Sequence, residues 1–234
     1  MELALIGLGK MGLNMATRLV RGGHRVIGYA RSTESVEAAA EIGIRYLTLY
    51  AFSTENWNRP STEIKALMSL LHTTLRNETK TLMDNQVRLR AIGDISALPA
   101  ALANELEKTM TFTAGNKGLT LILALSYSSR WEIMHAIRSL ANDVNRGKMA
   151  PENIDQQAFQ KYLATADFPD PELLIRTSGE LRISNFLLWQ IAYSELYFTD
   201  TLWPDFRKDD FFKAICNYQS RERRFGKISE QVNK

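Results

Sequence analysis

Short apolar runs alternate along the chain with longer stretches whose apolar residues recur at helical spacing. The short runs are typical of buried strands and fall at 2–6, 45–52, 87–94, 118–127, 172–179 and 196–198, with one alternating segment at 24–29. The longer stretches predict helices at 11–21, 32–43, 60–85, 97–111, 131–145, 185–195 and 209–223. This alternation predicts an α/β fold: a single domain with a mostly parallel central sheet flanked by helices.

Composition and charge narrow the class of protein. The 234 residues carry 29 basic and 26 acidic side chains, so the net charge is only +3. That balance argues against a general nucleic-acid binder. No apolar run approaches the roughly 18 residues that a membrane span needs, so we expect a soluble protein.

Cys216 is the only cysteine, which excludes a disulfide within the chain and fits a reducing cytoplasm. Its surroundings, FFKAICNYQ, have amphipathic helical spacing, and we expect Cys216 to fill the core rather than act as a nucleophile. The segment RGKMAPENIDQQ, residues 146–157, is predicted to be a surface loop.

Gly7, Gly9 and Gly12 form a G-x-G-x-x-G motif between a predicted strand and a predicted helix. Glycines there let the backbone approach a phosphate at a helix N-terminus. The end of the next predicted strand has Ala30 in place of a ribose-binding acid, while Arg31 could accept the 2′-phosphate of NADP. A tight turn that binds no nucleotide is the alternative.

This stretch, to about Ser35, resembles the start of 6-phosphogluconate dehydrogenases and related 3-hydroxyacid dehydrogenases. The resemblance implies a dinucleotide-binding first strand, loop and helix. Such an enzyme also needs a further nucleotide half and a large helical substrate domain, for which this chain is too short.

A second phosphate-binding pattern lies in the C-terminal half. Arg176 closes a predicted strand, and Arg182 and Ser184 follow in a loop that leads into a predicted helix. Two guanidinium groups and a hydroxyl suit a diphosphate, because the arginine fork matches phosphate oxygens in two-point contact. A pair of solvated arginines is the alternative.

Two further segments have chemical potential. Glu195 lies in an apolar stretch, where a carboxylate is either paired or bound to a metal. Ser53, Asn56, Trp57 and Arg59 follow the predicted carboxyl end of a central strand, where ligands bind in open α/β sheets. Asn56 is expected to have a polar role, whereas Trp57 could equally be a packing residue.

From about Val36 to Gly226 the chain resembles the undecaprenyl diphosphate synthases, a family of cis-prenyltransferases. The resemblance rests on five ordered blocks: LTLYAFSTENWNRP, VRLRAIGD, GLTLILALSYSSRWEI, LLIRTSGELRISNFLLWQIAYSELYFTDTLWPDF and RERRFG. It implies a transferase that joins isopentenyl diphosphate to an allylic diphosphate such as farnesyl diphosphate. The product would be the lipid carrier for cell-wall sugars.

The resemblance also implies roles for the residues already singled out. Arg176, Arg182 and Ser184 would bind the diphosphate of isopentenyl diphosphate, and Glu195 would help to hold Mg²⁺. The remaining implied set, which positions the isopentenyl unit and assists proton loss, is Ser53, Asn56, Trp57 and Arg59.

Further implications concern the product and the assembly. The helix 60–85 and the strand 118–127 would wall a tunnel for the growing chain, and there Ile122 replaces an expected asparagine. The family works as a cytoplasmic homodimer beside the membrane that receives its product. Arg221, Arg223 and Arg224 would reach the neighbouring subunit's active site, with a solvated basic tail as the alternative.

One family block is missing. The Asp-Gly-Asn-Gly-Arg-Trp loop, which holds Mg²⁺ and the allylic diphosphate, is absent, and IGLGKMG, with Gly7 near the aspartate position, takes its place. Lys10 could supply one positive charge but no carboxylate. We therefore expect a dehydrogenase-like graft over residues 1–35, a retained fold and severely reduced catalysis. The alternatives are an inactive hybrid that still binds isopentenyl diphosphate and an NADP-binding hybrid.

Overall fold

The computed structural model describes residues 2–6 and 43–222, and its centre is a six-stranded sheet. The strands are β1 (Glu2–Ile6), β2 (Tyr46–Ser53), β3 (Arg88–Ile92), β4 (Thr120–Tyr127), β5 (Leu173–Arg176) and β6 (Glu195–Phe198). They lie in the order β3-β4-β2-β1-β5-β6, and every pairing between neighbours is parallel. The predicted α/β fold with a parallel sheet is confirmed.

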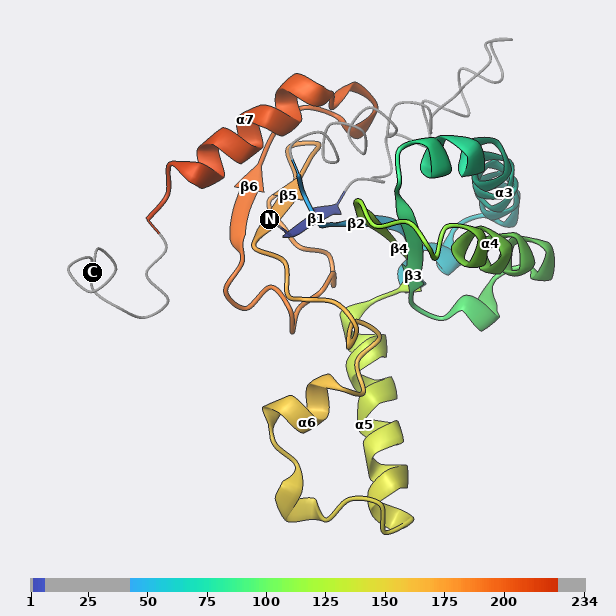
Figure 1. Cartoon of the computed structure of the whole chain (residues 1–234), viewed down its shortest axis with the longest axis vertical. Helices are drawn as coiled ribbons and strands as arrows, with labels where there is room; N and C mark the ends of the chain where they lie inside the picture. Colours follow the sequence, from blue (N-terminus) through green and yellow to red (C-terminus); the bar gives the residue numbers. More distant parts are fainter. Residues whose placement is uncertain (1, 7–42, 223–234) are drawn as a thin grey trace.

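Helices connect β2 to β3, β3 to β4 and β4 to β5, and a further helix follows β6. They are α3 (Ser61–Asp84), α4 (Ala100–Phe112), α5 (Ser129–Asn145), α6 (Gln156–Gln160) and α7 (Lys208–Gln219), with 3₁₀ turns η1 (Thr54–Asn58), η2 (Ile95–Ala97), η3 (Pro151–Asn153) and η4 (Trp203–Asp205). Both α3 and α4 begin directly after a proline, which has no N–H group to leave unbonded at a helix start. Figure 1 shows α5 and α6 projecting together away from the sheet.

The first face of the sheet is covered by α3, α4 and α7. The buried residues of α3 are Met68, Leu71, Leu75 and Leu82, whose spacing of three, four and seven places them on one side of the helix. They share one apolar cluster with buried leucines of α4, β2 and β4 and with Phe211 of α7. This cluster is the larger of the two cores.

The second face carries a smaller core, in which strand residues are covered by an irregular segment. It contains Tyr50, Ile92, Ile122, Ala124, Tyr127, Leu174, Phe186, Leu187 and Ile191. The rings of Tyr50 and Phe186 stack with their centroids 4.4 Å apart. Leu121 and Leu123 of β4 belong to the first core, with the buried residues of α3. Because side chains alternate between the two faces of a strand, Ile122 points to the second core, away from α3. The substitution at Ile122 therefore does not lie on the α3 side of β4.

The structure differs from the predicted helix at 185–195. Residues 184–193 form turns and bends, in which the Ile191 N–H donates to the Leu187 carbonyl at 2.9 Å and the Ser194 N–H to the Ile191 carbonyl at 3.1 Å. Ser184, Asn185 and Leu187 have φ values of 53°, 62° and 48°, which a right-handed helix does not allow. Three apolar residues of this segment, Phe186, Leu187 and Ile191, instead pack onto the second face of the sheet.

Other differences are local. The segment 146–157, predicted as loop, contains η3 and the start of α6, where the Asp155 side chain accepts the Ala158 N–H at 2.7 Å. Cys216 is exposed rather than buried, because the buried side of α7 passes through Phe211, Ala214, Ile215 and Tyr218. The predicted elements at 11–21, 24–29 and 32–43 lie outside the described residues. In the described part, no helix is long and apolar enough to span a membrane.

Candidate active site

The candidate site lies at the carboxyl edge of the sheet. Ser53 of β2 is paired with Tyr127 of β4, and both strands end at these residues. Ile6, the last residue of β1, lies between Tyr50 of β2 and Arg176 of β5. Because all strands are parallel, the loops after β2, β4 and β5 leave the sheet at one edge, where ligands bind in open α/β sheets.

The loop after β2 turns back onto the sheet through its own side chains. Asn56 Oδ1 accepts the Ser53 N–H at 3.0 Å, which closes the turn of η1. The Trp57 Nε1–H donates to Ser126 Oγ at 2.9 Å, and its ring meets Phe52 edge-on with the centroids 4.9 Å apart. Trp57 thus has both a packing contact and a polar one.

Arg59 follows η1 and pairs with Glu63 in the first turn of α3, where Nη1 lies 3.0 Å from Oε1. Each of these two side chains is at least three-quarters buried. The predicted set Ser53, Asn56, Trp57 and Arg59 therefore lies on one short segment, Ser53 to Arg59, at the carboxyl end of β2.

The loop after β5 brings the two predicted arginines together through an acid. Arg176 is buried, and its Nη2 lies 3.8 Å from Glu180 Oε2; the exposed Arg182 pairs with the same oxygen. Burial lowers the pKa of Arg176, and the nearby Glu180 opposes that shift. Sequence reasoning missed Glu180, although its place between two arginines in RTSGELR was the available signal.

Arg176 retains an unused donor. Its buried Nε has no hydrogen-bond partner among residues 2–6 and 43–222. Buried donors in proteins are nearly always bonded, so this N–H suits an incoming anion. Ser184, exposed in the same loop, takes a left-handed backbone conformation. The arrangement gives a buried guanidinium, an exposed one and a hydroxyl in one segment.

Glu195 lies at the amino end of its strand, away from the carboxyl edge of the sheet. It opens β6 opposite Leu173, whereas Arg176 is opposite Phe198, so the two positions are three residues apart along the strands. At a rise of about 3.3 Å per residue, that separation is roughly 10 Å. Glu195 Oε2 is 2.6 Å from Arg221 Nη1, which also donates to the Leu196 carbonyl. The structure does not bring Glu195 to the two arginines.

This placement bears on the magnesium that the family resemblance implies. Between residues 43 and 222 and in β1, no group of three His, Cys, Asp or Glu side chains could hold a metal ion. Glu195 is engaged by Arg221, within its own chain. These residues do not fit a magnesium site shared with Arg176 and Arg182. The phosphate-loop glycines Gly7, Gly9 and Gly12, together with Arg223 and Arg224, lie outside the described residues.

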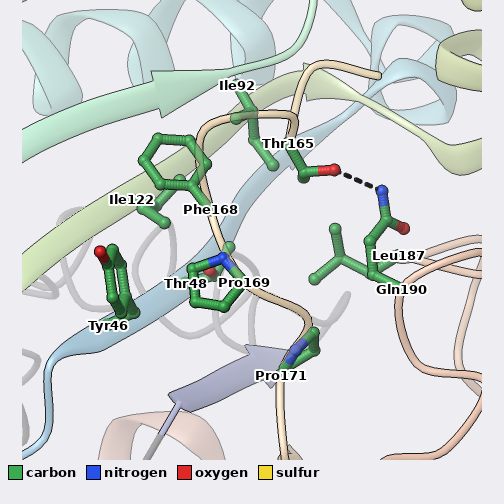
Figure 2. Close-up of a pocket in the computed structure, with 10 residues that line it drawn as sticks. All are labelled: Tyr46, Thr48, Ile92, Ile122, Thr165, Phe168, Pro169, Pro171, Leu187 and Gln190. Carbon is green, nitrogen blue, oxygen red and sulfur yellow. Dashed lines mark hydrogen bonds between the residues drawn. The ribbon is translucent and has the colours of Figure 1, made fainter. Parts of the chain in front are cut away.

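A buried polar network supports the loop after β5 from the second face. Glu132 of α5 accepts hydrogen bonds at Oε2 from the Tyr127 hydroxyl at 2.6 Å and from Gln190 Nε2 at 3.0 Å. Gln190 also donates to Thr165 Oγ1 at 2.7 Å, as Figure 2 shows. Burial raises the pKa of Glu132, and these hydrogen bonds oppose the shift. Sequence reasoning missed this network.

Figure 2 also shows a hollow beside the network, on the second face of the sheet. Its lining includes Tyr46, Thr48, Ile122, Phe168 and Pro171, and the empty space, open mouth included, is about 340 Å³. None of the predicted site residues lines it. The hollow therefore lies apart from the candidate site, although Gln190 borders it.

A parallel α/β sheet with arginines together at its carboxyl edge is typical of proteins that bind phosphorylated ligands. Comparison with known proteins identifies the kind. The family model described as putative undecaprenyl diphosphate synthase matches residues 14–226. The chain therefore belongs to the undecaprenyl diphosphate synthase family of cis-prenyltransferases, as the sequence blocks predicted.

Curated relatives agree with this assignment. The chain is 55% identical over 217 residues to an isoprenyl transferase of Porphyromonas gingivalis, covering 91% of this chain and 85% of that protein. It is 48% identical over 210 residues to the (2E,6E)-farnesyl-diphosphate specific ditrans,polycis-undecaprenyl-diphosphate synthase of Escherichia coli K12, covering 88% and 83%.

Solved structures show the same fold. Lavandulyl diphosphate synthase of Lavandula x intermedia, in complex with dimethylallyl diphosphate, matches with a TM-score of 0.88 and 35% identity. A probable undecaprenyl diphosphate synthase of Campylobacter jejuni matches with a TM-score of 0.78 and 33% identity. Each match covers 97% of this chain and 98% of the other.

Proposed function

We propose that this chain binds isopentenyl diphosphate at Arg176, Arg182 and Ser184 and is built to join it to an allylic diphosphate such as farnesyl diphosphate. The observation that carries this proposal is the buried Arg176 guanidinium, which shares Glu180 with Arg182 at the carboxyl end of β5. Support comes from the Escherichia coli relative, whose name states that it is specific for farnesyl diphosphate. The dimethylallyl diphosphate bound to the lavender enzyme adds an allylic diphosphate on the same fold.

The reaction divides the work between two loops. The carbon–oxygen bond of the allylic substrate breaks, its diphosphate leaves, and the isopentenyl double bond attacks the allylic carbon before one proton is lost. Arg176 and Arg182 would hold isopentenyl diphosphate, the five-carbon donor, by its diphosphate through charge-assisted hydrogen bonds. Glu180 would keep both guanidinium groups in place before binding. Ser53, Asn56, Trp57 and Arg59 would orient the isopentenyl unit for attack and proton loss. Donor binding at the arginines needs no metal ligand from Glu195.

We also propose that turnover is severely reduced relative to an intact synthase. The Asp-Gly-Asn-Gly-Arg-Trp block is absent from the sequence, and the family match begins only at residue 14, beyond Gly12. Departure of an allylic diphosphate requires its charge to be met by cations. Lys10 is the only charged residue between Leu3 and Leu13, so one cation stands where the family has an aspartate and an arginine.

A second candidate function is NADP binding at Gly7, Gly9 and Gly12. The favouring observation is β1, which forms the strand that must precede such a loop and ends one residue before Gly7. Titration of NADPH fluorescence tests it. A titration that stays flat to millimolar NADPH would dismiss this candidate.

Calorimetric titration with isopentenyl diphosphate tests the main proposal. We expect saturable binding by the full chain and its loss in Arg176→Ala; absence of binding by the wild type would overturn the proposal. Elongation assays with farnesyl diphosphate and Mg²⁺ test the reduced turnover. Product formation at the rate of an intact synthase would refute that part alone.

The assembly and location complete the proposal. By family, we propose a cytoplasmic homodimer that touches the membrane only through its lipid product. Arg223 and Arg224 would face the partner subunit, whereas Arg221 has a partner in its own chain, Glu195. Light scattering coupled to size-exclusion chromatography would show twice the 26.6 kDa chain mass; a monomer at micromolar concentration would contradict the dimer.

A further inference from the structure

Three segments of the candidate site meet at Asn185. Its Nδ2 donates to Glu55 Oε1 at 2.8 Å, which links the loop after β5 to η1 after β2. Its Oδ1 accepts the backbone N–H of Arg130 at 3.0 Å, and its carbonyl accepts the N–H of Ser129 at 2.8 Å. One asparagine thus bonds to the loop after β2 and to the first turn of α5. It directly follows Ser184, which with Arg176 and Arg182 forms the proposed diphosphate clamp.

The contact with α5 is a cap supplied from a distant segment. The first N–H groups of a helix have no partner inside the helix, and a side chain just before it usually accepts one of them. Ser128, which precedes α5, makes no such bond. Asn185, 55 residues from Arg130, accepts two of these N–H groups instead. The loop that carries the clamp is therefore attached to a rigid helix.

The backbone at this point suits asparagine. Asn185 has a φ of 62°, in the left-handed region that asparagine tolerates better than most residues. Its amide side chain offers a donor and an acceptor at once, and here each is used. Aspartate would tolerate the same backbone but lacks the donor.

The Glu55 side of the contact is anchored as well. Thr54, next to Glu55, donates from its hydroxyl to Ser128 Oγ at 2.7 Å. Burial raises the pKa of Glu55, but hydrogen bonds, that from Asn185 first among them, outweigh it and leave the pKa below its ordinary value. Glu55 is therefore charged at neutral pH, and the Asn185 amide donates to a carboxylate.

We propose that Asn185 is a positioning residue that holds the loop after β2 (residues 53–59) against the loop after β5 (residues 177–187). The two loops carry the two proposed halves of the donor site, so this inference rests on the proposed binding of isopentenyl diphosphate. When the diphosphate binds Arg176 and Arg182, the Asn185–Glu55 bond keeps Asn56 and Trp57 in place for the isopentenyl unit.

A donor–acceptor exchange tests this role. Asn185→Asp keeps the acceptor for the Arg130 N–H but sets a second carboxylate against Glu55. Adding Glu55→Gln restores one donor facing one acceptor, with the direction of the bond reversed. We expect Asn185→Asp to weaken isopentenyl diphosphate binding about tenfold, the lower end of what one hydrogen bond with a charged partner contributes. The double variant should recover to within about threefold of wild type.

Hydrogen exchange of residues 54–58 gives a readout without any ligand. We expect faster exchange there in Asn185→Asp and in Glu55→Ala, which removes the bond from the other side and leaves the cap of α5 intact. The exchange should return to the wild-type rate in the double variant. Asn153→Asp, which adds the same charge at an exposed position in η3, is the matched control and should change neither measurement.

The outcomes separate the two proposals. If the wild type does not bind isopentenyl diphosphate, the proposed function fails, while the exchange of residues 54–58 still decides the role of Asn185. Unchanged exchange in both Asn185→Asp and Glu55→Ala overturns that role. A double variant no better than Asn185→Asp also overturns it, because a purely structural defect would not be repaired by reversing the bond. If Asn185→Asp does not fold, Glu55→Ala alone carries the test.

Discussion

The two faces of the sheet are built differently. The first face is covered by α3, α4 and α7, whose buried residues follow helical spacing and form one apolar cluster. The second face is covered largely by the turns of 183–191 and contains a polar network centred on the buried Glu132. The loop that carries Arg182 and Ser184 belongs to the second face. Stability is therefore expected to depend mainly on the first face, and ligand binding on the second.

The largest expected effect is on the first face. Leu106→Ala removes a side chain of α4 with 0% exposure, and such a truncation costs about 2–5 kcal/mol of unfolding free energy. Denaturant titration measures the loss. Isopentenyl diphosphate should bind the folded fraction with unchanged affinity, and a parallel loss of affinity would contradict the separation of the two faces.

Substitutions of the clamp should show the opposite pattern. Arg176→Ala is expected to weaken isopentenyl diphosphate binding by about 100-fold, because a buried charged hydrogen-bond donor is worth about 1.5–3 kcal/mol. Arg182→Ala should cost about tenfold, since its side chain is 68% exposed and solvent screens it. Calorimetry measures both. Arg90→Ala, which changes a half-buried arginine paired with Asp167, is the matched control. An equal loss of binding there would show that the effect is not specific to the candidate site.

The polar network predicts a pH effect on stability. Burial raises the pKa of Glu132, so the folded protein holds this proton more tightly than the unfolded chain. The resulting stability is present at low pH and is lost as the pH rises through the raised pKa, by up to about 1.4 kcal/mol for each pH unit. Glu132→Gln cannot lose a proton. Relative to wild type, its unfolding free energy should therefore improve as the pH rises, and a pH-independent difference would refute the prediction.

The smallest effect is expected for a substitution on β4, where neighbouring residues face opposite sides of the sheet. Ile122→Val should cost about 1 kcal/mol of stability and leave the length of any prenyl product unchanged, because Ile122 faces the second core. Leu123→Ala, on the neighbouring position facing α3, is the contrasting variant. Gel separation measures the length of the products that the two variants form. A changed length with Ile122→Val would show that the two sides of β4 are not independent.

The sequence predicted the first face better than the second. The helices α3, α4 and α7 were expected within a few residues of their observed bounds, since a repeating apolar spacing is local information. The segment 185–195 was predicted as a helix from similar spacing and is not one, because Ser184, Asn185 and Leu187 have positive φ. Composition gives no sign of that backbone conformation at a leucine.

In the candidate site too, some features could be predicted from the sequence and others could not. Arg176 and Arg182 could be paired from their spacing within one loop, while the Glu55–Asn185 bond joins residues 130 positions apart and leaves no local pattern. The apolar surroundings of Glu195 predicted a paired or metal-bound carboxylate, and the family resemblance implied Mg²⁺ at the substrate diphosphates. The register of β5 and β6, which no single strand reveals, places Glu195 at the opposite edge.

The exposure of Cys216 has a practical consequence. It is the single cysteine of the chain, and it lies on the outer side of α7. A maleimide dye would therefore label every molecule at one known point, without first removing other thiols. Placed on the helix next to Asn217, which accepts a bond from Arg221, such a dye would report by its fluorescence whether the Arg221–Glu195 contact opens in solution.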